Sequence, residues 1–152
     1  MADNKEFPEG DDFSGVKKRN VSAFGQGNNV LAAAGGEAGV QQLVADFYHC
    51  IDSEPEAATI RAMHSDDLTE SQQKLTIFLI GWMGGEDRYI ERYGRINLAS
   101  AHRHLDIGLA EKKAWLMCMQ KALDAQPDYD ELLKRFIMVR LSFPAEMCRN
   151  RN

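Results

Sequence analysis

Four stretches of this chain repeat apolar residues at three- and four-residue steps, the spacing that places them on one face of an α-helix. The stretches run over residues 40–51, 68–82, 107–122 and 129–137. No segment alternates apolar and polar residues as a half-buried strand does, and no Asn-Gly pair marks a hairpin turn. The sequence therefore predicts an all-α fold with four substantial helices.

The breaks between these stretches set the expected helix ends. Gly-Gly pairs at 35–36 and 84–85 are expected to separate helices, because glycine readily adopts the left-handed conformation found there. Two short helices are also expected, one near 30–34 and one within 54–61. The residues from 86 to 105 are mixed, and we expect a loop with at most short helical turns, a kind of segment that is often functional.

Two local signals refine the second and last of the four long helices. Thr69 followed by Gln72 has the spacing of a capping box at the start of the helix over 68–82. Pro144 is expected to close the ordered region, since proline interrupts a helix interior.

The length of 152 residues and the apolar content of 44% are typical of one compact domain. We expect this domain to occupy residues 30–147. An N-terminal extension, residues 1–29, has too few apolar residues to bury a face of its own and holds at most one short helix. Residues 148–152 are expected to form a polar tail.

Charge and hydropathy exclude several classes of protein. A formal charge of -5 without a clustered basic face argues against nucleic acid as a partner. The longest apolar stretch, residues 75–83, is far shorter than the roughly 18 residues that span a bilayer, so no membrane association is expected. The first residues lack the basic and apolar regions of a secretory signal, which predicts a cytoplasmic protein.

The cysteines indicate neither a disulfide framework nor a zinc site. Cys50, Cys118 and Cys148 are odd in number and show no C-x-x-C spacing. We expect three reduced thiols, with Cys50 and Cys118 packed inside helices and Cys148 exposed near the polar end of the chain.

A histidine-bearing segment just before an amphipathic helix is the best candidate for chemistry. His102 lies in the irregular segment, and Trp115 follows on the helix over 107–122. A neutral imidazole beside an apolar helical wall is what a haem iron needs on one side, and a short helix ending near His102 would offer a carbonyl to orient the ring. A histidine is nevertheless more often a solvated or packed side chain. From the residues alone, both interpretations stay open.

Eight short runs, in register from about residue 30 to 143, resemble the group II truncated haemoglobins of bacteria and plants. The runs are Ala34-Gly35-Gly36, Phe47-Tyr48, Pro55-Glu56-Ala57, Asp67-Leu68-Thr69, Gly81-Trp82-Met83-Gly84-Gly85, Glu91-Arg92-Tyr93-Gly94, His102 with Ile107-Gly108, and Ala114-Trp115-Leu116-Met117-Cys118-Met119. The resemblance implies a two-over-two helical sandwich that encloses b-type haem, iron protoporphyrin IX. It does not cover the N-terminal extension.

The resemblance also assigns roles by position. His102 matches the proximal iron ligand, while Tyr48, His64 and Trp115 match residues beside the bound gas on the distal side. The positions expected to hold haem are Phe47, Ser71, Lys74, Leu75, Phe78, Leu79, Tyr89, Arg92, Leu98, His102, Ile107 and Trp115.

The chain departs from the family at three positions near the proposed iron ligand. His104 stands where the family often has proline, which raises the question of which histidine binds iron; we favour His102 and expect His104 at the surface. Ala99 and Ala101 replace arginines that would pair with the haem propionates. The remaining candidates for that pairing are Lys74, Tyr89, Arg92 and Arg103.

The expected function is binding of dioxygen, carbon monoxide and nitric oxide at a pentacoordinate iron. Hydrogen bonds from Tyr48 and Trp115 would slow release, which favours ligand scavenging or redox chemistry over bulk oxygen transport. Whether the protein is an enzyme stays open: peroxidase-like or nitric oxide dioxygenase activity would need a reductase, and His64 would serve as acid or base only if it points inward.

Two other functions remain as alternatives to scavenging or redox chemistry of a bound gas. The first is a haem-based gas or redox sensor that acts through a partner protein. The second, which applies only if the protein is colourless, is a helical interaction module without haem. We expect a monomer or weak dimer.

Overall fold

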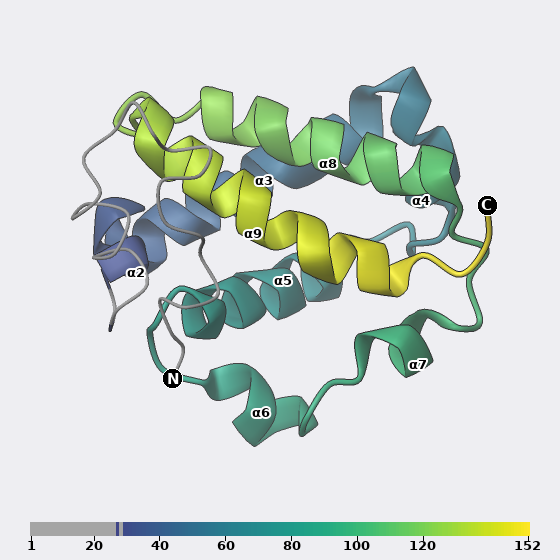
Figure 1. Cartoon of the computed structure of the whole chain (residues 1–152), viewed down its shortest axis with the longest axis horizontal. Coiled ribbons are helices and arrows are strands. Elements are labelled where there is room, and N and C mark those ends of the chain that lie inside the picture. Colours follow the sequence, from purple (N-terminus) through teal and green to yellow (C-terminus); the bar gives the residue numbers. More distant parts are fainter. Residues whose placement is uncertain (1–26, 28) are drawn as a thin grey trace.

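A computed structural model describes residue 27 and residues 29–152 of the chain. The short helix considered for the N-terminal extension lies outside these described residues. The elements, in order, are α2 (Asn29–Ala33), α3 (Gly36–Ser53), the 3-10 turn η2 (Pro55–Ala57), α4 (Ala58–Ala62), α5 (Thr69–Trp82), α6 (Arg88–Tyr93), α7 (Leu98–His102), α8 (Leu109–Asp124) and α9 (Glu131–Cys148). Figure 1 shows their arrangement.

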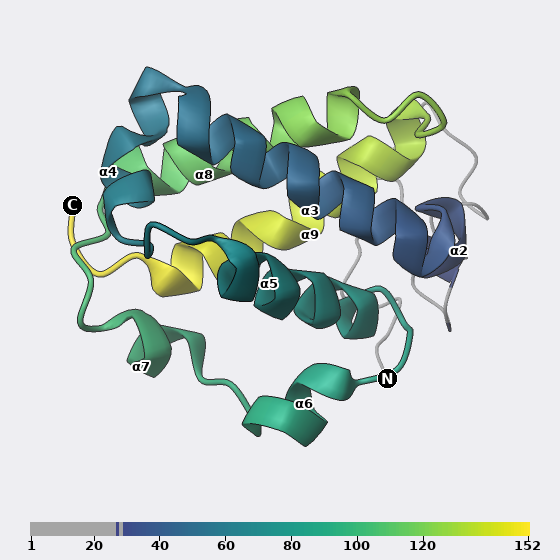
Figure 2. The same ribbon diagram turned by 180° about the vertical axis from the view of Figure 1, so that it is seen from behind.

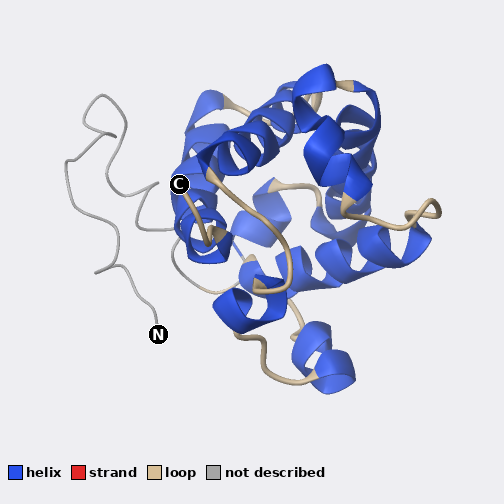
Figure 3. Cartoon of the chain, turned by 90° about the vertical axis from the view of Figure 1, so that its right-hand side faces the viewer, coloured by secondary structure: helices blue, strands red, loops and turns tan. Residues whose placement is uncertain are grey.

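The four long helices form two layers. In Figure 1, α8 and α9 lie in front of α3 and α5, and Figure 2 shows the same pairs from behind. The main helix–helix contacts are α3 with α8, α8 with α9, and α3 with α5. The all-α prediction is confirmed, since Figure 3 shows helices and loops but no strand in the described part of the chain.

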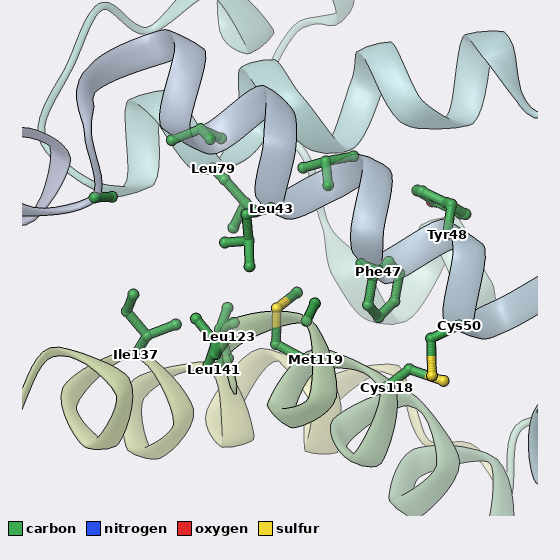
Figure 4. Packing of buried hydrophobic residues seen from close by; sticks show 14 of the residues in the cluster. Leu43, Phe47, Tyr48, Cys50, Leu79, Cys118, Met119, Leu123, Ile137 and Leu141 are labelled. Atoms are coloured by element: carbon green, nitrogen blue, oxygen red, sulfur yellow. The ribbon is translucent and has the colours of Figure 1, made fainter. Parts of the chain in front are cut away.

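The core lies between the layers and follows the predicted apolar stripes. Leu43 and Phe47 of α3 are at most 1% exposed, as are Met119 and Leu123 of α8. Figure 4 shows Phe47 pointing from α3 toward α8, while the neighbouring Tyr48 turns away to another side of the helix. This divergence follows from the helical rotation of about 100° between consecutive residues. Phe47 therefore belongs to the core, and Tyr48 faces a different environment.

The first Gly-Gly pair separates helices as predicted, with Gly35 preceding α3 at a positive φ of 92°. The close approach of α2 and α3 depends on Gly39, because a Cβ there would lie 1.8 Å from the carbonyl oxygen of Ala34. That carbonyl also accepts a hydrogen bond of 2.9 Å from the Tyr129 hydroxyl, which joins this corner to the start of α9.

Two helix-end predictions were wrong. Helix α9 continues through Pro144 to Cys148 instead of ending at the proline. The loss of one backbone hydrogen bond there is offset by tertiary contacts, including the packing of Leu141, which is 1% exposed. At the start of α5 there is no capping box with Gln72; the Asp67 carboxylate instead accepts hydrogen bonds from the Thr69 N–H (2.9 Å) and hydroxyl (2.7 Å).

The short elements and the cysteines also correct the sequence-based picture. Residues 86–105 hold only the short helices α6 and α7, as predicted for a loop with short helical turns. The single short helix expected within 54–61 is instead the pair η2 and α4. Cys50 and Cys118 are buried as predicted, and all three thiols are free. Cys148 is half-buried at the end of α9, not exposed. None of the helices described is long and apolar enough to span a membrane.

A matched pair of methionines tests the position of the core. Met119 is fully buried, whereas Met147 is 56% exposed. We expect Met119→Ala to lower the free energy of unfolding by about 2 to 5 kcal/mol, because it leaves a cavity. Met147→Ala should change it by less than about 0.5 kcal/mol. Urea unfolding followed by circular dichroism measures both, and equal effects would contradict the assignment of the core.

Candidate functional site: an apolar cavity between the helix layers

A cavity of about 320 Å³ opens between α3, α5, α7, α8 and the end of α9. Its lining is mainly apolar, with a few polar groups. It brings together all but two of the predicted site residues: Tyr48, His64, Ser71, Lys74, Leu75, Phe78, Leu79, Tyr89, Leu98, His102, Ile107 and Trp115. Residues so far apart in the sequence meet only because the two layers leave this end of the core unfilled.

Tyr48 brings a phenol hydroxyl to the cavity from α3. The residue is 6% exposed, and its hydroxyl makes no hydrogen bond to any other described residue. Burial raises the pKa of Tyr48 to about 12, because the charged phenolate is poorly solvated there. The hydroxyl therefore stays protonated at neutral pH and has a hydrogen bond to donate.

Trp115 and His64 lie beside the phenol. The rings of Tyr48 and Trp115 each lie 5.0 Å, centroid to centroid, from the Phe47 ring, which packs against both. His64 meets the Tyr48 ring edge-on at 5.6 Å, and its Nδ1 lies 2.9 Å from the Ile60 carbonyl. His64 is half-buried and lines the cavity. Three polar rings thus share one side of the cavity.

Helix α5 forms an apolar wall with a cationic edge. Ser71, Leu75 and Phe78 line the cavity from this helix, and Phe78 packs edge-on against Tyr89 at 6.0 Å. Lys74 lines the cavity as well, and its side chain is 44% exposed. Its Nζ lies 4.9 Å from the centre of the Tyr93 ring and 3.8 Å from Glu70. A flat apolar molecule with an anionic edge fits this wall.

His102, the last residue of α7, lines the same cavity from another helix. Its Nδ1 lies 2.8 Å from the carbonyl oxygen of Leu98, one helical turn earlier, as the sequence predicted for a short helix ending here. Nδ1 is also 3.6 Å from the sulfur of Cys148. Because Nδ1 is engaged, Nε2 is the ring nitrogen left to bind a metal. His104 is exposed and outside the cavity lining.

Two predicted haem contacts lie outside the cavity. Phe47 is 1% exposed in the core and supports Tyr48 and Trp115 rather than lining the space itself. Arg92 is exposed on α6, with its guanidinium 5.7 Å from the Tyr93 ring centre. Arg103, the further candidate for propionate binding, is exposed and reaches toward the Ser100 hydroxyl.

Sequence reasoning also missed part of the lining. These residues come from α4, the loops around α7, the start of α8 and the end of α9, and they are Ile60, Met63, Ile96, Leu105, Glu111, Lys112, Leu141, Pro144, Ala145 and Cys148. Placing the end of the ordered region at Pro144 left out Ala145 and Cys148. Helical periodicity beyond Pro144 was the signal that would have recovered them.

Comparison with known proteins shows which family the chain belongs to. A model of the family described as bacterial-like globin matches residues 29–147. The chain belongs to the bacterial-like globin family. The resemblance to group II truncated haemoglobins is confirmed by a relative, the group 2 truncated hemoglobin YjbI of Bacillus subtilis (strain 168), which is 32% identical over 122 residues, covering 80% of this chain and 89% of that protein.

Solved globin structures share the fold. The group II 2-on-2 hemoglobin from the plant pathogen Agrobacterium tumefaciens superposes with a TM-score of 0.76 at 34% identity, covering 81% of this chain and 95% of that one. A truncated oxygen-avid haemoglobin from Bacillus subtilis gives a TM-score of 0.72 at 31% identity, covering 80% and 98%. The predicted truncated-globin fold is thus confirmed.

Globin membership gives the cavity a chemical context. Globins bind haem, and the family implies gas ligands such as dioxygen. In this globin the cavity lining includes the His102 imidazole from α7, the Tyr48 phenol from α3, the Trp115 indole from α8 and the His64 imidazole from the segment after α4. An imidazole able to hold an iron, together with groups able to donate hydrogen bonds, suits a haem that also binds a gas.

Proposed function

We propose that this globin binds b-type haem in the cavity, with His102 Nε2 as the proximal ligand, and binds dioxygen, carbon monoxide or nitric oxide on the distal side. The observation that carries the proposal is the geometry of His102, whose Nδ1 is held 2.8 Å from the Leu98 carbonyl within the cavity lining. A neutral imidazole oriented in this way is a ready metal ligand.

The lining suits the haem macrocycle. Leu75, Phe78 and Ile107 offer apolar surface to a flat ring, which is the main source of binding free energy for such a group. Lys74 is the cation that both lines the cavity from α5 and reaches solvent, so it would pair with a propionate at the rim. Ala99 and Ala101 have no side chain able to do this.

When bound, haem supplies an iron with one coordination position free for a diatomic gas. The Tyr48 hydroxyl and the Trp115 indole N–H would donate hydrogen bonds to that gas. Neither group has a hydrogen-bond partner among the described residues, so binding a gas would not break an existing hydrogen bond of either group. Each such bond contributes about 1 to 3 kcal/mol in a desolvated site.

Two strong donors would make release slow, which favours scavenging or redox chemistry over bulk transport. The relative from Bacillus subtilis named as oxygen-avid is consistent with this direction. A partner reductase, a cytoplasmic location, the domain boundaries and the oligomeric state stay predictions from the sequence.

The iron ligand is tested by a pair of histidine variants. We expect purified wild-type protein, reconstituted with haem, to show an intense absorbance band near the blue edge of the visible that shifts on addition of dithionite. His102→Ala should lose haem or the spectrum of a histidine-bound iron, because Nε2 is gone. His104→Ala should match wild type, since His104 is exposed outside the cavity. A colourless wild-type protein would refute the proposal, and the reverse result for the two variants would refute the ligand.

The distal donors are tested by dissociation kinetics. Tyr48→Phe and Trp115→Phe should each raise the dioxygen dissociation rate about 5- to 150-fold, as expected from losing about 1 to 3 kcal/mol. The effect of Tyr48→Phe should be the same from about pH 6 to pH 9, because a hydroxyl with a pKa of about 12 stays protonated throughout. Stopped-flow measurement gives the rates.

Matched controls exist for both substitutions. Tyr129→Phe removes another buried hydroxyl, one bonded to the Ala34 carbonyl outside the cavity, and Trp82→Phe alters a half-buried indole that does not line it. Neither control should change the dissociation rate. If the Tyr48 and Trp115 variants released dioxygen at the wild-type rate, both residues would serve only in packing.

A second activity, turnover of peroxide or nitric oxide, is favoured by the inward position of His64. Its ring lies against Tyr48, so it is placed to exchange a proton with a ligand in the cavity. We expect reconstituted protein to oxidise a phenolic reporter with hydrogen peroxide, and His64→Leu to lose about 100-fold or more of that rate, the usual contribution of a general acid or base. Activity that is absent, or independent of His64, would remove this second function.

A further inference from the structure

The end of α9 reaches back to the segment that carries His102. The side-chain amide of Asn150 donates one hydrogen bond to the carbonyl oxygen of His102 (3.2 Å) and another to that of Leu105 (2.7 Å). These carbonyls belong to the end of α7 and the turn after it, where the last carbonyls of a helix have no partner within the helix. The His102 carbonyl also accepts a hydrogen bond from the Leu105 N–H (3.0 Å). Asn150 therefore acts as a C-terminal cap for α7, supplied from a point 48 residues later in the chain.

The backbone strengthens this contact. The Ile107 N–H donates to the Asn150 Oδ1 (3.0 Å), and the Ile107 carbonyl accepts from the N–H groups of Asn150 (2.8 Å) and Arg151 (3.1 Å). The Arg151 guanidinium pairs with Asp106 and with Glu111, the latter at 3.2 Å. We call residues 148–151 the C-terminal clasp. It holds both ends of the turn from His102 to Ile107.

Helix α7 needs such support. It has five residues, too few to be stable in isolation, and most of them are exposed. Its main contact with another helix is with α9, the helix that carries the clasp. Figure 1 shows α7 at the edge of the molecule, with the chain end beside the loop that leads from α7 to α8. The clasp is therefore placed to hold the end of α7 that carries the imidazole.

Cys148, the first residue of the clasp, lies close to the His102 ring. Its sulfur lies 3.6 Å from His102 Nδ1, the nitrogen already within 2.8 Å of the Leu98 carbonyl. When Nε2 binds a metal, Nδ1 carries the proton and donates, so the sulfur is a weak second acceptor. Acceptors on that N–H increase the basicity of the ligand.

We propose that the C-terminal clasp positions the proximal imidazole, with Asn150 fixing the end of α7 and Cys148 adjusting the N–H of the ring. The proposal rests on the proposed function, because it presupposes that His102 binds haem iron. Its residues act through His102 and are positioning residues. The competing explanation is that the clasp only stabilises the fold.

The test compares Asn150→Ala, Asn150→Asp and the control Asn152→Ala, each reconstituted with haem. Asn150→Asp keeps the acceptor for the Ile107 N–H but lacks the donor for His102 and Leu105. The Asn152 side chain makes no hydrogen bond to another described residue. Resonance Raman spectroscopy of the ferrous protein reports the iron–histidine stretching band, and transfer to an acceptor apoprotein reports haem loss.

We expect both Asn150 variants to shift the iron–histidine band to lower frequency and to lose haem about 10- to 100-fold faster. Cys148→Ala should give a smaller shift in the same direction, with an unchanged melting temperature. The C–O stretching band of the carbon monoxide complex, which reports the distal side, should stay as in wild type. Asn150→Asp behaving like wild type, or variants that change only the melting temperature, would overturn the proposal.

Amide exchange on the wild-type protein keeps the test decisive if the variants fold poorly. The Ile107 N–H should exchange slowly with solvent, because it is bonded to Asn150, and rapid exchange would overturn the clasp. Failure of the proposed function and failure of the clasp give different results. Wild-type protein that never binds haem refutes the proposed function, whereas wild-type protein that binds haem through His102 with Asn150 variants unchanged refutes only the clasp.

Discussion

The packing of α3 against α8 around Phe47 is the contact on which both the fold and the distal half of the site depend. Phe47 is almost fully buried and touches the rings of Tyr48 and Trp115 at the same 5.0 Å separation of centroids. One core residue therefore sets the spacing between two hydrogen-bond donors that come from different helices. A ligand in the cavity meets donors whose positions were fixed when the core formed, so little reorganisation is needed at binding.

The residues of the candidate site are held in two different ways. Tyr48 and Trp115 extend from long helices whose apolar faces form the core, whereas His102 ends a five-residue helix at the edge of the molecule. Hydrogen bonds compensate there for missing apolar contacts: the Leu98 carbonyl orients the ring, and Asn150 ties down the turn that follows. The gas would therefore bind beside groups held rigidly by the core, and the metal would be held by a residue whose position depends on hydrogen bonds.

Much of this arrangement was predictable because helical periodicity is a local property. The faces of α3, α5, α8 and α9 could be read directly, and the resemblance to truncated haemoglobins then gave the roles expected of Tyr48, Trp115 and His102. Phe47 was predicted to contact haem because it adjoins Tyr48 in the sequence, but one helical step turns its side chain into the core. The sequence predicts an end at Pro144 because proline rules describe isolated helices, whereas the contacts that carry α9 past it are tertiary. The approach of Asn150 to His102 depends on the path of the whole chain, so no local pattern announces it.

The clasp also has a practical consequence for handling the protein. Residues joined directly after Asn152, such as a purification tag, would lie beside residues whose backbone and side chains hold the turn that follows His102. Spectra and gas-binding rates recorded on such a fusion would include any effect of the tag on that turn. Material intended for those measurements is better made with such a tag removed.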